Sequence, residues 1–133
     1  MKPAVLLLDT TNFYSGLVFK GLENKVLKSD KYIFVTTEFT IAEIYWLLTE
    51  KRGMNRKDAL DLIKSVPLII IKSNFFKHKW NEADGLIGNR DKSDIPLVAL
   101  ALSLKNHDGI WSSDKDFEVV KGKFKIWKSR ELL

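Results

Sequence analysis

Short apolar runs alternate with longer stretches of helical spacing along this chain of 133 residues. The apolar runs predict strands at residues 4–8, 32–36, 67–72, 109–112 and 123–127, the last of them at an edge of the sheet. The stretches between them predict helices at residues 12–20, 22–28, 38–51, 56–66, 73–87 and 94–105. The strand runs are apolar at nearly every position, which is typical of parallel strands covered by helices on both faces.

This order of elements predicts an α/β fold, a three-layer α/β/α sandwich around a mainly parallel central sheet of four to five strands. The length suits one domain. The chain contains no internal repeat and no linker rich in proline and glycine. We therefore expect residues 1–133 to form a single domain, with Trp46 and Trp111 in its core.

The composition narrows the kinds of site that the chain can build. It has no cysteine, which excludes disulfides and thiolate zinc sites and favours a reducing, cytoplasmic location. The first apolar run ends at Asp9, too early for a signal-peptide core or a membrane span. The net charge of +5 suits a polyanionic partner, although many lysine-rich proteins are equally basic without binding nucleic acid.

Four acids stand at positions where such a sheet could bring them together. Asp9 directly follows the first strand, Glu43 is the only charge between residues 39 and 49, Asp94 opens an uncharged helix, and Asp114 follows the fourth strand. Each has a structural alternative. A turn or helix cap explains Asp9, Asp94 and Asp114, and a narrow solvated stripe explains Glu43.

The four acids are stronger candidates for a functional site together than singly, because ligands of α/β sheets bind beyond the carboxyl ends of the strands. Carboxylates gathered there would repel one another, and a divalent cation such as Mg²⁺ or Mn²⁺ would relieve that repulsion. Such an ion can also activate water for attack on a phosphodiester. Asn12 and Asp116 are auxiliary candidates. Asp91, flanked by Arg90 and Lys92, has the sequence context of an ordinary solvated loop.

The motifs around these acids resemble those of the PIN-domain nucleases. They are Leu-Leu-Leu-Asp-Thr-Thr-Asn at Asp9, Thr-Ile-Ala-Glu-Ile at Glu43, Asp-Ile-Pro-Leu-Val-Ala-Leu-Ala-Leu at Asp94, and Trp-Ser-Ser-Asp-Lys-Asp-Phe at Asp114. A serine pair stands where the family commonly has a threonine before the fourth acid, and residues 75–90 match no family motif. The resemblance therefore says nothing about the choice of substrate.

The resemblance implies an endoribonuclease that depends on Mg²⁺ or Mn²⁺ and uses Asp9, Glu43, Asp94 and Asp114 as catalytic residues and metal ligands. Many small members, the VapC type, are toxins of toxin–antitoxin pairs, so a small antitoxin and a homodimer are expected partners besides RNA. An RNA-processing nuclease without an antitoxin and a catalytically inactive binding module remain alternatives. A receiver-like phosphoacceptor is disfavoured because Asp9 is followed by Thr-Thr-Asn.

Two basic clusters are candidates for gripping RNA through its phosphates. The first comprises Lys51, Arg52, Arg56 and Lys57, and the second comprises Lys77, His78 and Lys79 beside Trp80. A solvated surface explains each of these residues equally well, so none of them is assigned to the site.

Overall fold

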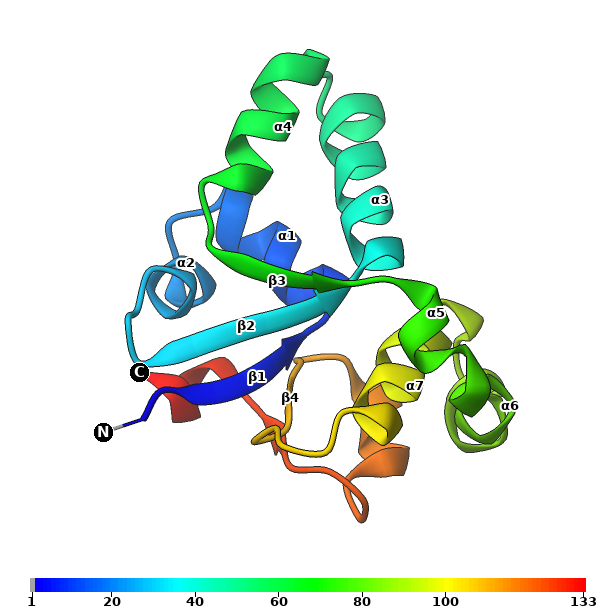
Figure 1. Cartoon of the computed structure of the whole chain (residues 1–133). Coiled ribbons are helices and arrows are strands. Elements are labelled where there is room, and N and C mark those ends of the chain that lie inside the picture. The colour runs from blue at the N-terminus through cyan, green and yellow to red at the C-terminus, as the bar shows by residue number, and fades with distance from the viewer. Residues whose placement is uncertain (1) are drawn as a thin grey trace.

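A computed structural model, which describes residues 2–133, contains one central sheet of five parallel strands (Figure 1). The strand order is β3-β2-β1-β4-β5. The strands are β1 (Ala4–Leu8), β2 (Tyr32–Thr37), β3 (Leu68–Ile71), β4 (Ile110–Trp111) and β5 (Ile126–Trp127). The predicted α/β class and parallel sheet are therefore confirmed, including the fifth strand at an edge.

Helices cover both faces of this sheet, as the continuous apolar strands predict. One layer contains α1 (Thr10–Val18), α2 (Leu22–Leu27), α3 (Glu38–Trp46) and α4 (Arg56–Lys64). The other contains α5 (Ser73–Phe76), α6 (Trp80–Ala83) and α7 (Ile95–Ser103) (Figure 1). Among the described residues, no helix is long and apolar enough to cross a membrane.

The first strand shows how one apolar run serves two cores. Leu6 and Leu8 pack with Phe13 and Ile44 under the first helical layer. Leu7 lies in the other cluster, which is dominated by α7. Successive side chains of a strand point to opposite faces, so a strand buried on both sides must be apolar at every position.

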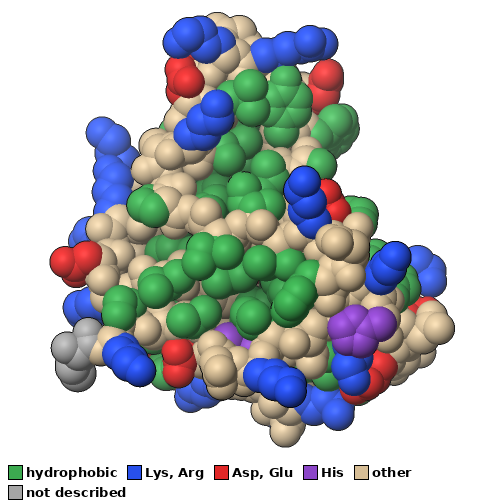
Figure 2. Space-filling model, in the orientation of Figure 1, with side chains coloured by type: hydrophobic (Ala, Val, Ile, Leu, Met, Phe, Trp, Pro, Cys, Tyr) green, Lys and Arg blue, Asp and Glu red, His purple; other side chains and the backbone are tan. Residues whose placement is uncertain are grey.

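The edge strand β3 departs from this expectation. Ile69 is 50% exposed and Ile70 is 46% exposed, because β3 has a neighbour on one side only and its helical cover is incomplete. Figure 2 shows hydrophobic side chains gathered across the middle of the same view, where Figure 1 places β2 and β3. The apolar run predicted the strand correctly but predicted too much burial for it.

Helix α3 has a more exposed outer face than the sequence suggested. Trp111 is fully buried as predicted, but the core position predicted for Trp46 is wrong, since its side chain is 53% exposed. Ile44 points into the core, whereas Phe39, Glu43 and Trp46 follow one another at helical spacing on the outer face. An apolar composition therefore hid the orientation of this helix.

The helix predicted at residues 73–87 is divided into short pieces. A 3-10 turn (Lys77–Lys79) separates α5 from α6, and a π-helical turn (Asp84–Gly88) follows α6. The backbone leaves the helical region at Phe76, whose side chain is fully buried in the core. The segment still packs on α7 through buried residues, so its role as a covering element is kept.

Gly109 offers a test of how closely β4 and β5 approach. Its φ is +124°, and a Cβ atom there would lie 2.3 Å from the Lys125 carbonyl oxygen. We expect Gly109→Ala to cost more than about 1 kcal/mol of unfolding free energy and to lower the melting temperature by at least about 2 °C. Thermal unfolding measures this. Gly122→Ala is the matched control, because nothing lies within 4 Å of its Cβ position. Equal melting temperatures for the two variants would contradict the expectation.

Candidate active site

The strand order changes direction at β1, which places a crevice between the carboxyl ends of β1 and β4. Asp9 directly follows β1, and the loop from Ser112 to Asp114 directly follows β4. Ligands of open α/β sheets bind at this kind of switch point. The fold therefore brings two of the four acids to the expected edge.

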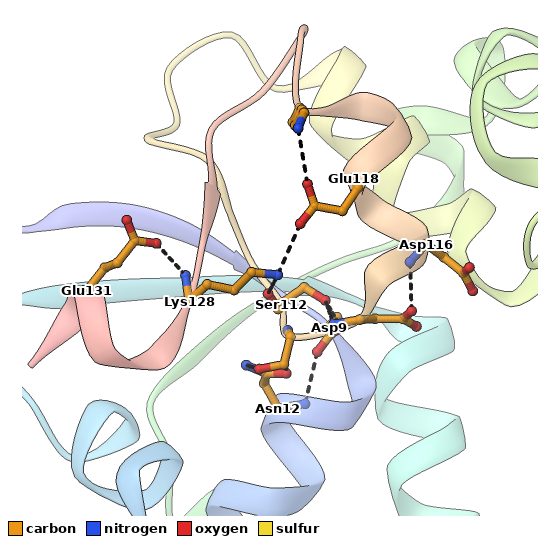
Figure 3. Close-up of polar contacts among 10 residues, drawn as sticks. Asp9, Asn12, Ser112, Asp116, Glu118, Lys128 and Glu131 are labelled. Atoms are coloured by element: carbon orange, nitrogen blue, oxygen red, sulfur yellow. Dashed lines mark hydrogen bonds and ion pairs between the residues drawn. The ribbon is translucent and has the colours of Figure 1, made fainter.

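The Ser112 hydroxyl joins the ends of these two strands (Figure 3). It donates to Asp9 Oδ2 at 2.5 Å and accepts the backbone N–H of Asp114 at 3.0 Å. Asp9 Oδ1 accepts the backbone N–H of Asn12 at 2.9 Å, so the carboxylate also caps α1. With a side chain only 4% exposed, Asp9 is held in one orientation.

Asn12, an auxiliary candidate from the sequence, is buried at this junction, inside a helix that begins earlier than the predicted residue 12. Helix α1 begins at Thr10, so Asp9 takes the capping position. The Asn12 side chain instead accepts the N–H of Ser113 at 3.1 Å and donates to its hydroxyl at 3.3 Å. Asn12 thus positions the loop that carries Asp114.

Asp94, Asp114 and Asp116 converge with a fourth acid, Asp91. One carboxylate oxygen from each of these residues lies within 4.8 Å of the others. Asp114 Oδ1 also accepts the Asp116 N–H at 2.9 Å. The described residues thus contain one cluster that combines two predicted catalytic acids, one auxiliary acid and one acid that sequence reasoning set aside.

Asp91 reaches this cluster because it caps a short 3-10 turn (Lys92–Asp94) that leads into α7. Its Oδ1 accepts the Ser93 N–H at 2.9 Å and the Ser93 hydroxyl at 2.7 Å. The available signal was the spacing Asp-x-x-Asp in front of an apolar helix. An acid three residues before Asp94 can lie on the same side of a helical turn as Asp94, even when basic residues flank that acid in the sequence.

Glu43 lies outside that cluster and borders the centre from α3. It is exposed on the outer face of the helix and lines a cavity of about 260 Å³ together with Thr10 and Ser93. These two residues directly adjoin Asp9 and Asp94. The negative charge of Glu43 contributes to raising the pKa of Asp9. Glu43 therefore faces the same centre as Asp9, but from solvent rather than from an apolar interior.

Burial and neighbouring carboxylates raise the pKa values of Asp9 and Asp94. Burial is the main cause that raises the pKa of Asp9 to about 6, while hydrogen bonds from Ser112 and Asn12 oppose it. Burial also raises the pKa of Asp94 to about 8, with further increases from neighbouring carboxylates, Asp91 first among them. The fold thus holds carboxylates where their ionised forms are unfavourable without a compensating positive charge.

These donors suit a hard divalent cation. The Oδ2 atom of Asp94 is buried and has no hydrogen-bond partner among the described residues. Buried carboxylate oxygens without a partner are rare and costly unless a cation is bound. Carboxylate oxygens are the ligands that Mg²⁺ and Mn²⁺ prefer. The residues at this edge therefore fit such an ion.

Comparisons with known proteins agree with the fold and with the family that the motifs resemble. A family model described as PIN domain matches residues 8–133. Among solved structures, the fold is similar to that of VapC20 from Mycobacterium tuberculosis, described as a Sarcin-Ricin loop cleaving toxin. The TM-score is 0.65 at 14% sequence identity, covering 91% of this chain and 96% of that one. No curated protein matches the sequence.

The raised pKa values make the metal-free protein sensitive to pH. A carboxyl group with a raised pKa in the folded state binds its proton more tightly there than in the unfolded chain, so its contribution to stability falls as pH rises. For Asp94 the loss extends from about pH 4 to about pH 8. We expect Asp94→Asn to melt at least about 3 °C above the wild type at pH 9 with chelator, and close to it at pH 4.

The matched control is Asp61→Asn, which removes an exposed acid paired with Lys57 on α4. Thermal unfolding in chelator across this pH range should give nearly the wild-type profile for the control. A constant difference between Asp94→Asn and the wild type from pH 4 to pH 9 would contradict the assigned role of Asp94.

Proposed function

Since the chain belongs to the PIN-domain family of nucleases, we propose that it is an endoribonuclease that hydrolyses RNA phosphodiester bonds with Mg²⁺ or Mn²⁺. The observation that carries this proposal is the buried Oδ2 atom of Asp94, which has no hydrogen-bond partner within residues 2–133 and lies among several other carboxylates. A site of this composition has little use without a cation, and a cation held by carboxylates is suited to phosphodiester chemistry.

In this proposal Asp9, Glu43, Asp94 and Asp114 would hold the cation, and Asp91 and Asp116 would add further carboxylates to the site. When bound, the cation supplies Lewis-acid stabilisation of the phosphate charge and lowers the pKa of a water molecule. Ser112 fixes the Asp9 carboxylate by donating its proton to it, so this hydroxyl positions a ligand and does not attack. Water is the nucleophile.

We further propose that the protein acts as the toxin of a toxin–antitoxin pair in the cytoplasm, as a homodimer restrained by a small antitoxin. The similarity in fold to the VapC20 toxin supports this choice over an RNA-processing role.

Induced expression should arrest the growth of a bacterial host. Normal growth with abundant, folded, active protein would favour the processing enzyme. A sarcin–ricin loop oligonucleotide is a rational first substrate, because the structural relative is described as cleaving that loop.

Asp9→Asn tests the catalytic assignment directly. The amide keeps an oxygen for the Asn12 N–H but loses the negative charge, so we expect cleavage to fall by about 100-fold or more with little change in fold. Cleavage of a single-stranded RNA by purified protein measures this, and circular dichroism checks the fold. Asp61→Asn should retain wild-type activity. Undiminished cleavage by Asp9→Asn would refute the assignment.

Asp91→Asn tests whether this acid belongs to the cation site. Asparagine preserves the cap that accepts from Ser93 while removing one charge. Isothermal titration calorimetry with Mn²⁺ should show that Asp91→Asn binds the ion about tenfold more weakly than the wild type does. The metal-free variant should melt above the wild type, because the repulsion of Asp94 is reduced.

Glu118→Gln is the control for loss of nearby charge, since Glu118 lies on the same 3-10 turn as Asp116 but pairs with Lys121 and Lys128. It should bind Mn²⁺ as the wild type does. Equal Mn²⁺ affinity for Asp91→Asn and Glu118→Gln would remove Asp91 from the site. Absence of Mn²⁺ binding by the wild type would contradict the metal dependence itself.

A further inference from the structure

The cavity of about 260 Å³ beside Glu43 opens directly next to the acids of the candidate active site. Thr10 follows Asp9 in the chain, and Ser93 precedes Asp94. Together with Glu43 they line part of the cavity. A phosphodiester positioned at the acids would therefore bring an adjoining part of the same RNA strand to this cavity.

Two aromatic side chains also line the cavity. Phe39 from α3 and Trp80 from α6 line the cavity with their ring centroids 5.9 Å apart and their planes at 58°, and Pro96 from α7 adds a further apolar surface. Phe39 is 44% exposed even though Phe76 also contacts its ring. Figure 1 shows that α3 and α6 belong to opposite helical layers. The contact between the Phe39 and Trp80 rings therefore joins the two layers.

Lys92 is the positive side chain of this cavity, and it is exposed. Among residues 2–133 it forms no ion pair, whereas Lys79 nearby in sequence is paired with Glu82. An unpaired ammonium group beside two aromatic rings complements a nucleotide, in which a flat base is joined to a phosphate. An apolar peptide would use the rings but would leave Lys92 without a partner.

We propose that this cavity binds one unpaired nucleobase of the RNA next to the scissile phosphate, stacked on Phe39 or Trp80, with Lys92 contacting the flanking phosphate. The inference rests on the proposed ribonuclease function and names the form of RNA that the site accepts. A base held in a duplex cannot enter the cavity, so the enzyme requires a single-stranded or looped nucleotide at this position.

The test combines a protein change with an RNA change. Phe39→Ala should lower kcat/KM for a single-stranded RNA by about tenfold, and Phe39→Tyr should restore most of it because tyrosine also stacks. An RNA with a single abasic nucleotide, placed in turn at each position around the cleaved bond, should lose a similar factor at one position. At that position Phe39→Ala should cause no further loss.

Phe75→Ala is the matched control, since Phe75 is 46% exposed on α5 and does not line the cavity. It should cleave intact and abasic RNA like the wild type. Circular dichroism and thermal unfolding should show that the Phe39 variants remain folded. If Phe39→Ala is unstable, Lys92→Gln provides the second variant, with weaker RNA binding and a smaller salt dependence than the wild type.

Several outcomes would overturn the subsite. Additive losses from Phe39→Ala and the abasic nucleotide would show that the ring and the base act independently. Unchanged kinetics for Phe39→Ala would leave the exposed ring to another partner, such as a protein. These results are distinct from failure of the proposed function, in which neither the wild type nor Phe75→Ala would cleave any RNA.

Discussion

The hydrogen bonds of the Ser112 hydroxyl hold together the end of β1 and the loop after β4. One bond fixes the carboxylate of Asp9 and the other fixes the backbone of Asp114. Asn12 reinforces this junction through Ser113. Because parallel strands finish at a common edge, these few bonds are enough to bring acids separated by about a hundred residues into one centre. The helices on either side supply the remaining acids to a position that the strands have already defined.

Like charges at this edge oppose folding, and the structure concentrates them rather than dispersing them. Burial and neighbouring carboxylates raise the pKa of Asp94 to about 8. The pKa of Asp9 is raised to about 6, although two hydrogen bonds favour its ionised form. Purely structural carboxylates usually obtain a cationic partner or enough hydrogen bonds. The buried Oδ2 atom of Asp94 has neither among the described residues. Such a cost is typical of a site that is completed by a ligand.

Sequence patterns predicted the sheet and the carboxyl ends of its strands well, because both depend on local hydrophobicity, whereas β5 begins at Ile126 and not at the predicted residue 123. They were less informative where orientation depends on tertiary packing. Glu43 is isolated in an apolar helix, yet the face that carries it is exposed, as Trp46 shows. Asp91 looked like part of a solvated loop because its neighbours are basic, and only the 3-10 turn brings it to Asp94. For β3, an apolar run could not distinguish an edge strand from a central one.

The exposed face of α3 borders the acid centre, which explains why this face carries functional side chains. Glu43 and Phe39 are one helical turn apart, so the same face presents a carboxylate and an aromatic ring to one cavity. From the other layer, the segment before α7 presents Lys92 and Ser93 to the same space as it delivers Asp94 to the acids. Cleavage chemistry and recognition of the adjoining nucleotide would then depend on the same two elements. A shift of α3 relative to α7 would change both at once, which ties the geometry of the acids to the shape of the cavity.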